Sequence, residues 1–251
     1  MTLPTLILAA LFCVTALIYA SAGFAGGSTY LALLALAGFS YQLMPATALV
    51  CNVVVASGGA FHYARAGHFR LKNVLPFLLT SVPLAYVGGR WPISKQAFML
   101  LLGVMLFVAA LRLLLNDKKF QRHAEPAWKQ AWLTGLPLGA LLGLVSGLTG
   151  IGGGILLSPV LYLLGWADAK QVAAASSLFI LANSVSGLLG QWQKGGSLPE
   201  WGVLVPLVVA VIVGGQIGAS LGANRFPKMV VQRVSAVLVM LVSAKLLWEG
   251  F

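Results

Sequence analysis

Gly147-Leu148-Thr149-Gly150-Ile151-Gly152-Gly153-Gly154 interrupts a long apolar segment in the second half of this chain. A shorter version, Gly23-Phe24-Ala25-Gly26-Gly27, interrupts an apolar segment 127 positions earlier, in the first half. At this offset eight residues between positions 23 and 48 are identical to their counterparts, whereas a composition this skewed would give roughly three by chance. The sequence therefore predicts two related halves, each with a helix pair broken at glycines, an arrangement typical of membrane transporters.

The composition predicts an integral membrane protein. Of the 251 residues, 59% are hydrophobic and 8% are charged, while a soluble domain carries about 25% charged residues. The net charge of +11 comes from cations in short loops between apolar runs, which predicts contact with anionic lipid at the cytoplasmic face rather than with nucleic acid. Cys13 and Cys51 each lie alone in an apolar run, so we expect neither a disulfide nor a metal site, and no cofactor.

Ten apolar runs can be marked, five in each half, and they predict an all-α integral membrane protein. We expect a first membrane repeat at 1–115, a cytoplasmic linker at 116–130 and a second membrane repeat at 131–251. A spanning helix needs about 20 apolar residues, so the first two runs of each half, which are shorter, are either tilted spans or a re-entrant pair. The runs are 3–20, 28–39, 43–64, 73–89 and 97–115 in the first half, and 131–148, 155–166, 171–192, 202–223 and 234–248 in the second.

We expect the N-terminal run to be retained in the mature protein. Ala20-Ser21-Ala22 resembles a signal-peptide cleavage site, but no Lys or Arg precedes the run 3–20. This run also corresponds to 131–148 in the second half, so its removal would destroy the duplication.

The loop charges predict the orientation. If the chain crosses the membrane ten times, four of the 16 Lys and Arg residues lie on the side of the N-terminus and the other twelve on the opposite side. The positive-inside rule then places both termini of a multi-pass membrane protein on the outer side, away from the cytoplasm. If each broken pair crossed only once, the cations would divide ten to six, which is a weaker bias. Five crossings per half make the two repeats inverted relative to each other.

The two glycine breaks are the main candidates for a binding site. A helix start leaves unpaired backbone N–H groups with a partial positive charge, and glycine lets an anion approach them closely. Polar side chains of the third runs need a partner helix or a cavity in hydrocarbon. The alternatives are that the glycines only let helices pack closely and that the hydroxyls bond their own helix. The candidates for binding a small anion are Gly26, Gly27, Ser28, Thr29, Asn52, Ser57, Thr149, Gly152, Gly153, Gly154, Ser176, Ser177 and Asn183.

The positions of the acidic residues favour an anion as substrate. Cation pumps and proton relays usually need an Asp or Glu inside the membrane, and no such residue lies in any of the ten runs. A hydrolase would also need a carboxylate to orient a histidine base, so we do not expect an enzyme. His62 ends the third run and is a candidate for proton coupling. The five acidic residues are Asp117, Glu125, Asp168, Glu200 and Glu249.

The second break belongs to a longer stretch, Gly147-Leu148-Thr149-Gly150-Ile151-Gly152-Gly153-Gly154-Ile155-Leu156-Leu157-Ser158-Pro159, which resembles a signature of the sulfite exporter family TauE/SafE. Ala173-Ala174-Ala175-Ser176-Ser177-Leu178 resembles the segment that follows in that family. The first break departs from the pattern, because Ala25 stands where glycine is favoured and Ala32 stands opposite Pro159. The resemblance implies transport of sulfur-containing anions, such as sulfite or organosulfonates, across a bacterial inner membrane.

The expected function is secondary transport by alternating access, with export of a small anion held at the glycine-rich helix breaks. Two alternatives remain open at this point. One is a proton-coupled importer of the same sulfur-containing anions, and the other is a membrane assembly protein without transport activity. The anion and anionic lipid are the expected partners, and an oligomer is possible.

Overall fold

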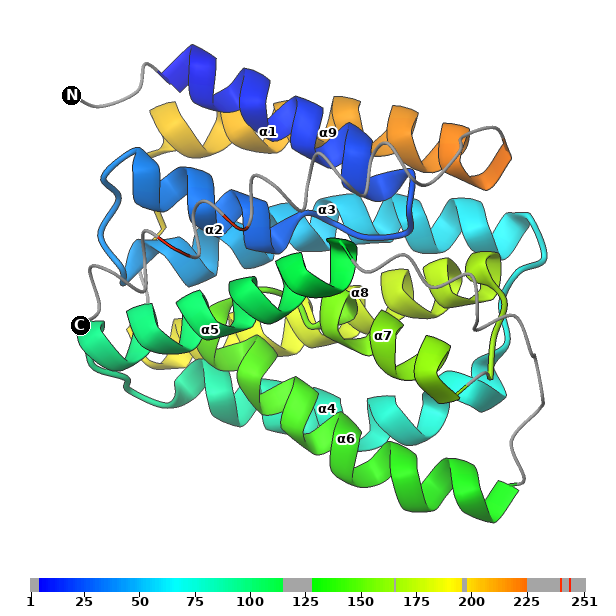
Figure 1. Cartoon of the computed structure of the whole chain (residues 1–251). Coiled ribbons are helices and arrows are strands. Elements are labelled where there is room, and N and C mark those ends of the chain that lie inside the picture. Colours follow the sequence, from blue (N-terminus) through cyan, green and yellow to red (C-terminus); the bar gives the residue numbers. More distant parts are fainter. Residues whose placement is uncertain are drawn as a thin grey trace.

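The computed structural model describes residues 5–114, 128–164, 166–195 and 198–224, together with Met240 and Ala244. This described part of the chain contains helices and turns but no strand, as the sequence predicted (Figure 1). The predicted run 234–248 and most of the predicted linker lie outside the described residues. The helices are α1 (Thr5–Ala20), α2 (Gly27–Leu36), α3 (Leu43–Arg65), α4 (Leu71–Arg90), α5 (Lys95–Leu114), α6 (Trp128–Thr149), α7 (Gly154–Leu164), α8 (Ala169–Gln193) and α9 (Trp201–Asn224).

Four of these helices, α3, α6, α8 and α9, are long and apolar enough to span a membrane. The expectation of a short first run in each half holds for α1, which has 16 residues, but is wrong for α6, which has 22. Helix α6 begins at Trp128, inside the predicted linker, because polar residues such as Gln130 continue the backbone hydrogen bonding of a helix beyond its apolar part.

Both helix breaks lie where the sequence predicts them. The chain leaves helical geometry after α1 and after α6 and resumes it at Gly27 and Gly154. The first break contains Gly26, with φ of 96°, and the second contains Gly152, with φ of 84°. Residues with a side chain rarely adopt this left-handed conformation, so glycine is required there.

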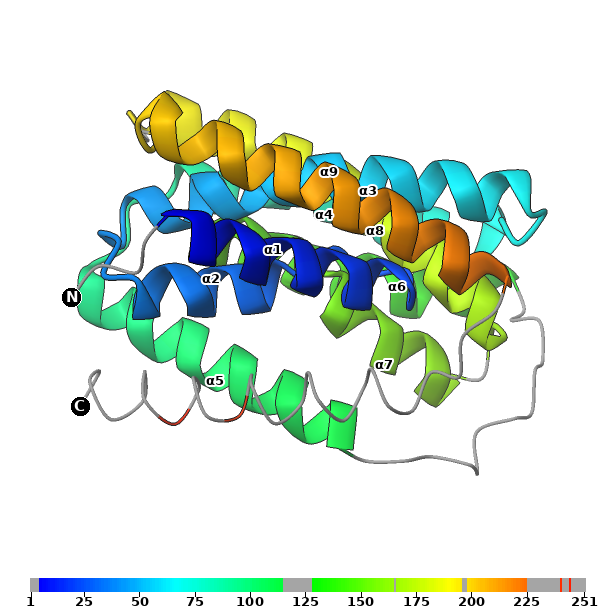
Figure 2. The same ribbon diagram turned by 90° about the horizontal axis from the view of Figure 1, so that it is seen from above.

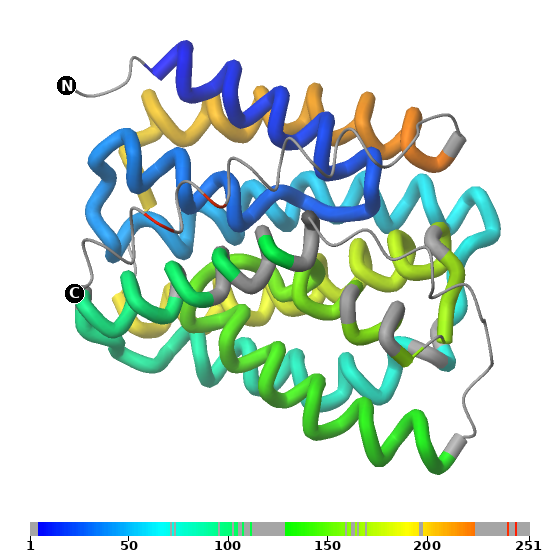
Figure 3. The backbone as a smooth tube through the Cα atoms, viewed as in Figure 1, coloured from blue at the N-terminus to red at the C-terminus, as the bar shows by residue number. Residues whose placement is uncertain are grey.

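Helices of one half pack against helices of the other half, and these helix pairs are called the exchanged pairs below. Helix α1 of the first half lies along α9 of the second, and α6 of the second half lies along α4 of the first (Figures 1 and 3). Helices α3 and α8 lie between these two pairs and contact each other. The contacts of the first half are repeated in the second. Helix α3 contacts α9, α2 and α1, and in the same way α8 contacts α4, α7 and α6. Among the described residues, each of the clusters of buried apolar side chains accordingly contains residues of both repeats.

Glycines bring the backbones of the exchanged pairs into contact. One face of α6 consists of glycines four residues apart, and a Cβ at any of them would collide with α4. The same holds for one face of α9 against α1. Close backbone approach between small residues is the main source of helix association in a membrane. The glycines are Gly135, Gly139, Gly143 and Gly147 in α6, and Gly214, Gly218 and Gly222 in α9.

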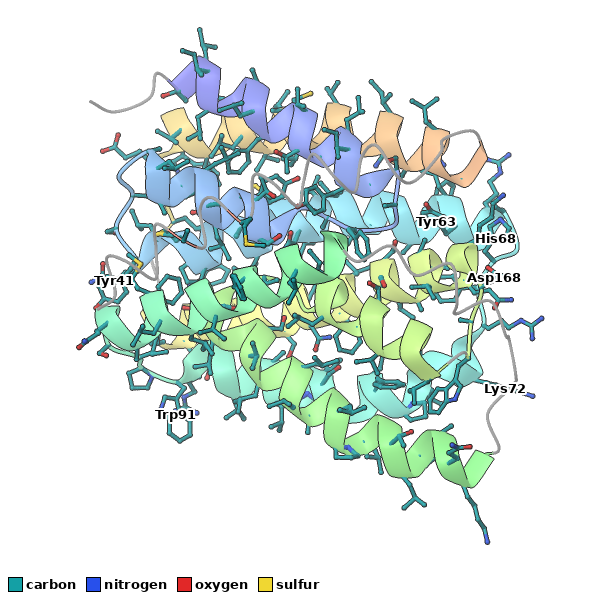
Figure 4. All side chains as sticks on the ribbon, in the orientation of Figure 1. Tyr41, Tyr63, His68, Lys72, Trp91 and Asp168 are labelled. Carbon is teal, nitrogen blue, oxygen red and sulfur yellow. The ribbon has the colours of Figure 1, made fainter. Side chains whose placement is uncertain are left out.

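Four of the turns between helices lie at two opposite ends of the molecule. Tyr41 and Trp91, in the turns before α3 and after α4, lie at one end, while His68, Lys72 and Asp168 lie at the other (Figure 4). Asp168 caps α8, since its carboxylate accepts from the Lys170 and Gln171 backbone N–H groups at 2.8 and 2.9 Å. The turn between α3 and α4 and the turn before α8 thus lie at one end, opposite to the turns before α3 and after α4.

Candidate substrate site at two facing helix starts

The two glycine breaks meet in the middle of the molecule. Helices α2 and α7 start there and run away in opposite directions (Figure 2). A Cβ placed on Gly27 would lie 2.5 Å from the carbonyl oxygen of Ile151, in the other break, and 2.5 Å from Nδ2 of Asn52. A cavity of about 10 Å³ lies between the breaks. It is lined by Tyr19, Phe24, Ala25, Gly26, Gly27, Ser28, Ile151, Ile155 and Ile180.

Asn52 joins the first half to the second break. Its Nδ2 donates to the carbonyl oxygens of Gly150 at 3.3 Å and Ile151 at 3.2 Å. The side chain is fully buried in α3, and its Oδ1 has no hydrogen-bond partner. Because both neighbours of Nδ2 are carbonyls, which only accept, the amide orientation is fixed and Oδ1 is the atom left for a ligand.

Ser177 makes the reciprocal connection from the second half to the first break. Its hydroxyl lies 3.0 Å from the carbonyl oxygen of Gly23 and 2.9 Å from that of Ala173, one turn earlier in α8. A Cβ on Gly23 would collide with Ala173, so α8 and the first break are in direct contact. Each glycine break is therefore held by the third helix of the other half.

Buried hydroxyls without partners surround the breaks. The Ser184 hydroxyl lies 3.1 Å and the Tyr30 hydroxyl 3.2 Å from where a Cβ would stand on Gly152 and Gly26, respectively. Neither hydroxyl has a hydrogen-bond partner, and both side chains are fully buried. A buried polar group without a partner is costly, so these groups indicate a site that a polar ligand can complete.

Two of the nearby hydroxyl residues were missed by the sequence analysis. Ser146, also buried and without a partner, lies one turn before Gly150, whose N–H bonds the Ser146 carbonyl at 2.8 Å. Tyr30 lies one turn after Gly26 and bonds its carbonyl at 2.9 Å through the backbone. Extending the search by one helical turn on either side of each break would have found both.

The two helix starts make the site electropositive without a charged side chain. The first intrahelical acceptors are the carbonyls of Gly26 in α2 and Gly153 in α7. The N–H groups of the first helical residues therefore have no acceptor within their own helix. Each helix start is equivalent to roughly half a positive charge. Two such poles facing each other repel, and an anion between them would remove that repulsion.

The remaining predicted residues divide into two groups. Ser28 and Thr29 are buried in the first turn of α2, and the Thr29 hydroxyl donates to the Tyr19 hydroxyl at 2.8 Å. The Thr149 hydroxyl donates to the carbonyl of Val145 at 2.8 Å, directly before the second break.

Ser176 lies beside the second break, because a Cβ on Gly154 would stand 3.1 Å from its carbonyl oxygen. Ser57 and Asn183 instead donate to carbonyls of their own helices, at 2.6 and 2.8 Å. The structure thus brings Gly26, Gly27, Ser28, Asn52, Gly152, Gly153, Gly154 and Ser177 to the two breaks.

His62 lies away from the breaks. It is ten residues beyond Asn52, which corresponds to about 15 Å along α3. Its Nε2 lies 3.1 Å from Oε1 of Gln216 in α9, so it connects the two halves near their surface. Among the described residues, no group of three His, Cys, Asp or Glu side chains could hold a metal ion.

Apolar helices interrupted in pairs, with the interruptions meeting in the core, define a membrane protein built like a secondary transporter. More particularly, the chain belongs to the TauE/SafE family, since the family model described as "Sulfite exporter TauE/SafE" matches residues 7–246. No solved structure matches the chain significantly.

The curated relatives support the membership. A probable membrane transporter protein, y4hK, from Sinorhizobium fredii is 34% identical over 96% of this chain and 97% of its own length. Another, YunE from Bacillus subtilis, is 25% identical over 83% and 82% of the two lengths. A third, from Xylella fastidiosa, is 27% identical over 82% of both. The protein is accordingly a membrane transporter of this family.

Proposed function

We propose that the protein exports a small sulfur oxyanion, sulfite or an organosulfonate, across a bacterial inner membrane, and that it is not an enzyme. The observation that carries the proposal is the meeting of two helix starts around Asn52. It supplies positive potential, free backbone donors and unpartnered buried polar atoms at one place. The family description adds sulfite as the substrate to test.

The binding groups in this proposal are backbone N–H groups and neutral side chains. The N–H groups of the first turns of α2 and α7 would hold the anionic oxygens, because they have no acceptor within their helices. The hydroxyls of Tyr30 and Ser184, which lie beside Gly26 and Gly152 without partners, would complete the shell.

In the described conformation the cavity between the breaks is too small for an oxyanion. A cavity of about 10 Å³ holds at most a single water molecule, so an oxyanion can enter only when the breaks move apart. Alternating access would result if one inverted repeat rocked against the other, opening each break to one side in turn. The hydrogen bonds of Asn52 and Ser177 across the halves would have to rearrange in that movement.

The membrane potential can drive export without a coupled ion. With both termini in the periplasm, the loops around His68 and Asp168 face the cytoplasm. The membrane potential makes the cytoplasm negative relative to the periplasm. For a divalent anion at about 150 mV, the potential supplies roughly 7 kcal/mol, or about five decades of concentration ratio. An ionisable side chain in the membrane is then unnecessary.

Flux measurements in proteoliposomes test this function. Sulfite-loaded vesicles should release sulfite when an interior-negative potential is imposed, with or without a pH step, and protein-free vesicles should not. A thermal-shift screen with sulfite, sulfate, thiosulfate, sulfonates and carboxylates should show stabilisation by sulfur oxyanions. If no anion stabilised or crossed with the protein, the proposal would be wrong.

A proton-coupled importer is the second candidate, favoured by the contact of His62 with Gln216 between the halves. On that mechanism a pH gradient alone would drive uptake, and His62→Gln would remove the coupling. On the export mechanism a pH gradient alone would not drive net flux, so the same vesicles separate the two functions.

A further inference from the structure

We infer that the species bound and carried is a singly charged oxyanion that keeps one O–H group, which for sulfite is hydrogensulfite rather than the sulfite dianion. This inference rests on the proposed function and narrows the range of substrates, because organosulfonates and the sulfite and sulfate dianions lack that O–H group. Two independent features of the site lead to it.

The first feature is the hydrogen bonding of Asn52. Its Nδ2 donates to the Gly150 and Ile151 carbonyls at 3.3 and 3.2 Å, so the atom of this amide that is left without a partner is an acceptor. That acceptor, Oδ1, is buried and unpartnered, and it lies 2.9 Å from where a Cβ would stand on Gly27. Oδ1 therefore faces the backbone of Gly27, the first residue of α2.

An oxyanion without a proton would place a lone pair against this Oδ1. A protonated oxyanion can donate its O–H to Oδ1 while its other oxygens accept from the helix starts. Sites built to hydrogen-bond a hydroxyl discriminate strongly against analogues that lack it, because a buried polar group is then left unpaired.

The second feature is the charge balance. Two helix starts together are equivalent to roughly one positive charge. No Lys, Arg, His, Asp or Glu is among the residues that line the cavity. The other titratable groups nearby are the phenols of Tyr19 and Tyr30, a type that is uncharged at neutral pH. One negative charge is therefore neutralised in this apolar core, and a second would remain unbalanced.

Binding to the purified full-length protein gives the first test. Titrations with sulfite are made at a pH where the monoanion dominates and at a pH where the dianion dominates. Sulfate, a dianion at both, and methanesulfonate, a monoanion with a methyl group in place of the hydroxyl, are the matched controls. We expect the apparent sulfite affinity to fall about tenfold for each pH unit above its second pKa. Sulfate and methanesulfonate should bind at least tenfold more weakly than hydrogensulfite, independently of pH.

Proton movement during transport gives the second test. If sulfite leaves a vesicle as hydrogensulfite at a pH where the dianion dominates, each departing ion removes one proton. An enclosed pH dye should then report alkalinisation in step with sulfite efflux, and one charge should move per anion. Protein-free vesicles correct for passive permeation of sulfur dioxide.

The outcomes separate this inference from the proposed function. Equal binding of the sulfite monoanion and dianion, or efflux of two charges without alkalinisation, would overturn the inference and leave anion export standing. Loss of the proton signal in His62→Gln with continued efflux would also overturn it, since the proton would then travel on the protein. Absence of any anion binding or flux would remove the proposed function itself.

Discussion

At the residue scale, Asn52 decides whether the second break is held in place. Its amide satisfies two buried carbonyls of an irregular segment that has no regular hydrogen-bonding partners of its own. Irregular backbone at membrane depth is tolerated only where such partners or a watery cavity exist. Asn52 therefore combines a structural role with the proposed role of offering Oδ1 to the anion.

Replacing Asn52 by Ala should destabilise the protein and abolish anion binding. Two buried carbonyls would lose their donor, at a cost of about 1–3 kcal/mol each before relaxation. Thr47→Ala is the control on the same helix, since Thr47 is buried and donates only to the Leu43 carbonyl. It should cost about 1 kcal/mol and keep sulfite-induced stabilisation in a thermal-shift assay. Equal behaviour of the two variants would contradict the role given to Asn52.

Gly152→Ala tests whether the second break contributes to sulfite binding. A Cβ there would be strained by the φ of 84° and would stand 2.9 Å from Nδ2 of Asn52. Gly67 has a similar φ of 74° but no neighbour within 4 Å, so Gly67→Ala has the strain alone, about 1–2 kcal/mol. We expect Gly152→Ala to lose sulfite binding and Gly67→Ala to retain it. Retained binding in both, measured by calorimetry, would place the anion elsewhere.

At the element scale, exchanged helix pairs hold the repeats together. The glycine faces of α6 and α9 allow backbone contact with α4 and α1, which only glycine permits at these distances. Glycine therefore acts as a packing residue on these two helix faces. The breaks differ, because their glycines have positive φ and adjoin unpartnered polar atoms.

Gly143→Leu should prevent stable assembly of α6 on α4, because the new side chain would collide with the backbone of Ser81. Overpacking costs typically 1–3 kcal/mol where neighbours can adjust, and backbone cannot adjust easily. Gly202→Leu, at a site on α9 with no neighbour within 4 Å, should fold normally. Size-exclusion profiles and thermal unfolding of both variants measure the difference. A monodisperse, stable Gly143→Leu protein would contradict the packing described.

At the scale of the whole molecule, the sequence predicted the helices and the breaks. It did not predict that helices of one half pack against helices of the other half. The 127-residue offset located both breaks, and most helix bounds differ from the apolar runs by one to three residues. Asn52 and Ser177 were candidates because buried polar groups need partners. That each binds the other half's break depends on how the repeats interlock, and hydropathy and spacing contain no such information.

Orientation in the membrane is a prediction at this same scale. Ala66 and Ser40 are exposed, in turns at opposite ends of α3, and the native Cys51 is buried. In intact cells of a strain in which Cys13 is replaced by Ala, a membrane-impermeant thiol reagent should label Ser40→Cys and not Ala66→Cys. Labelling in the reverse order would place the termini in the cytoplasm and reverse the assigned polarity.

The central claim is that an oxyanion binds between the starts of α2 and α7. Its most direct test is an experimental structure of the protein with hydrogenselenite, whose selenium atom is located by anomalous scattering. We expect a selenium peak between Gly27 and Gly154, with oxygens within hydrogen-bonding distance of the first-turn N–H groups and of Asn52. A selenium peak at any other place, or breaks packed together with no ion between them at saturating concentration, would contradict it.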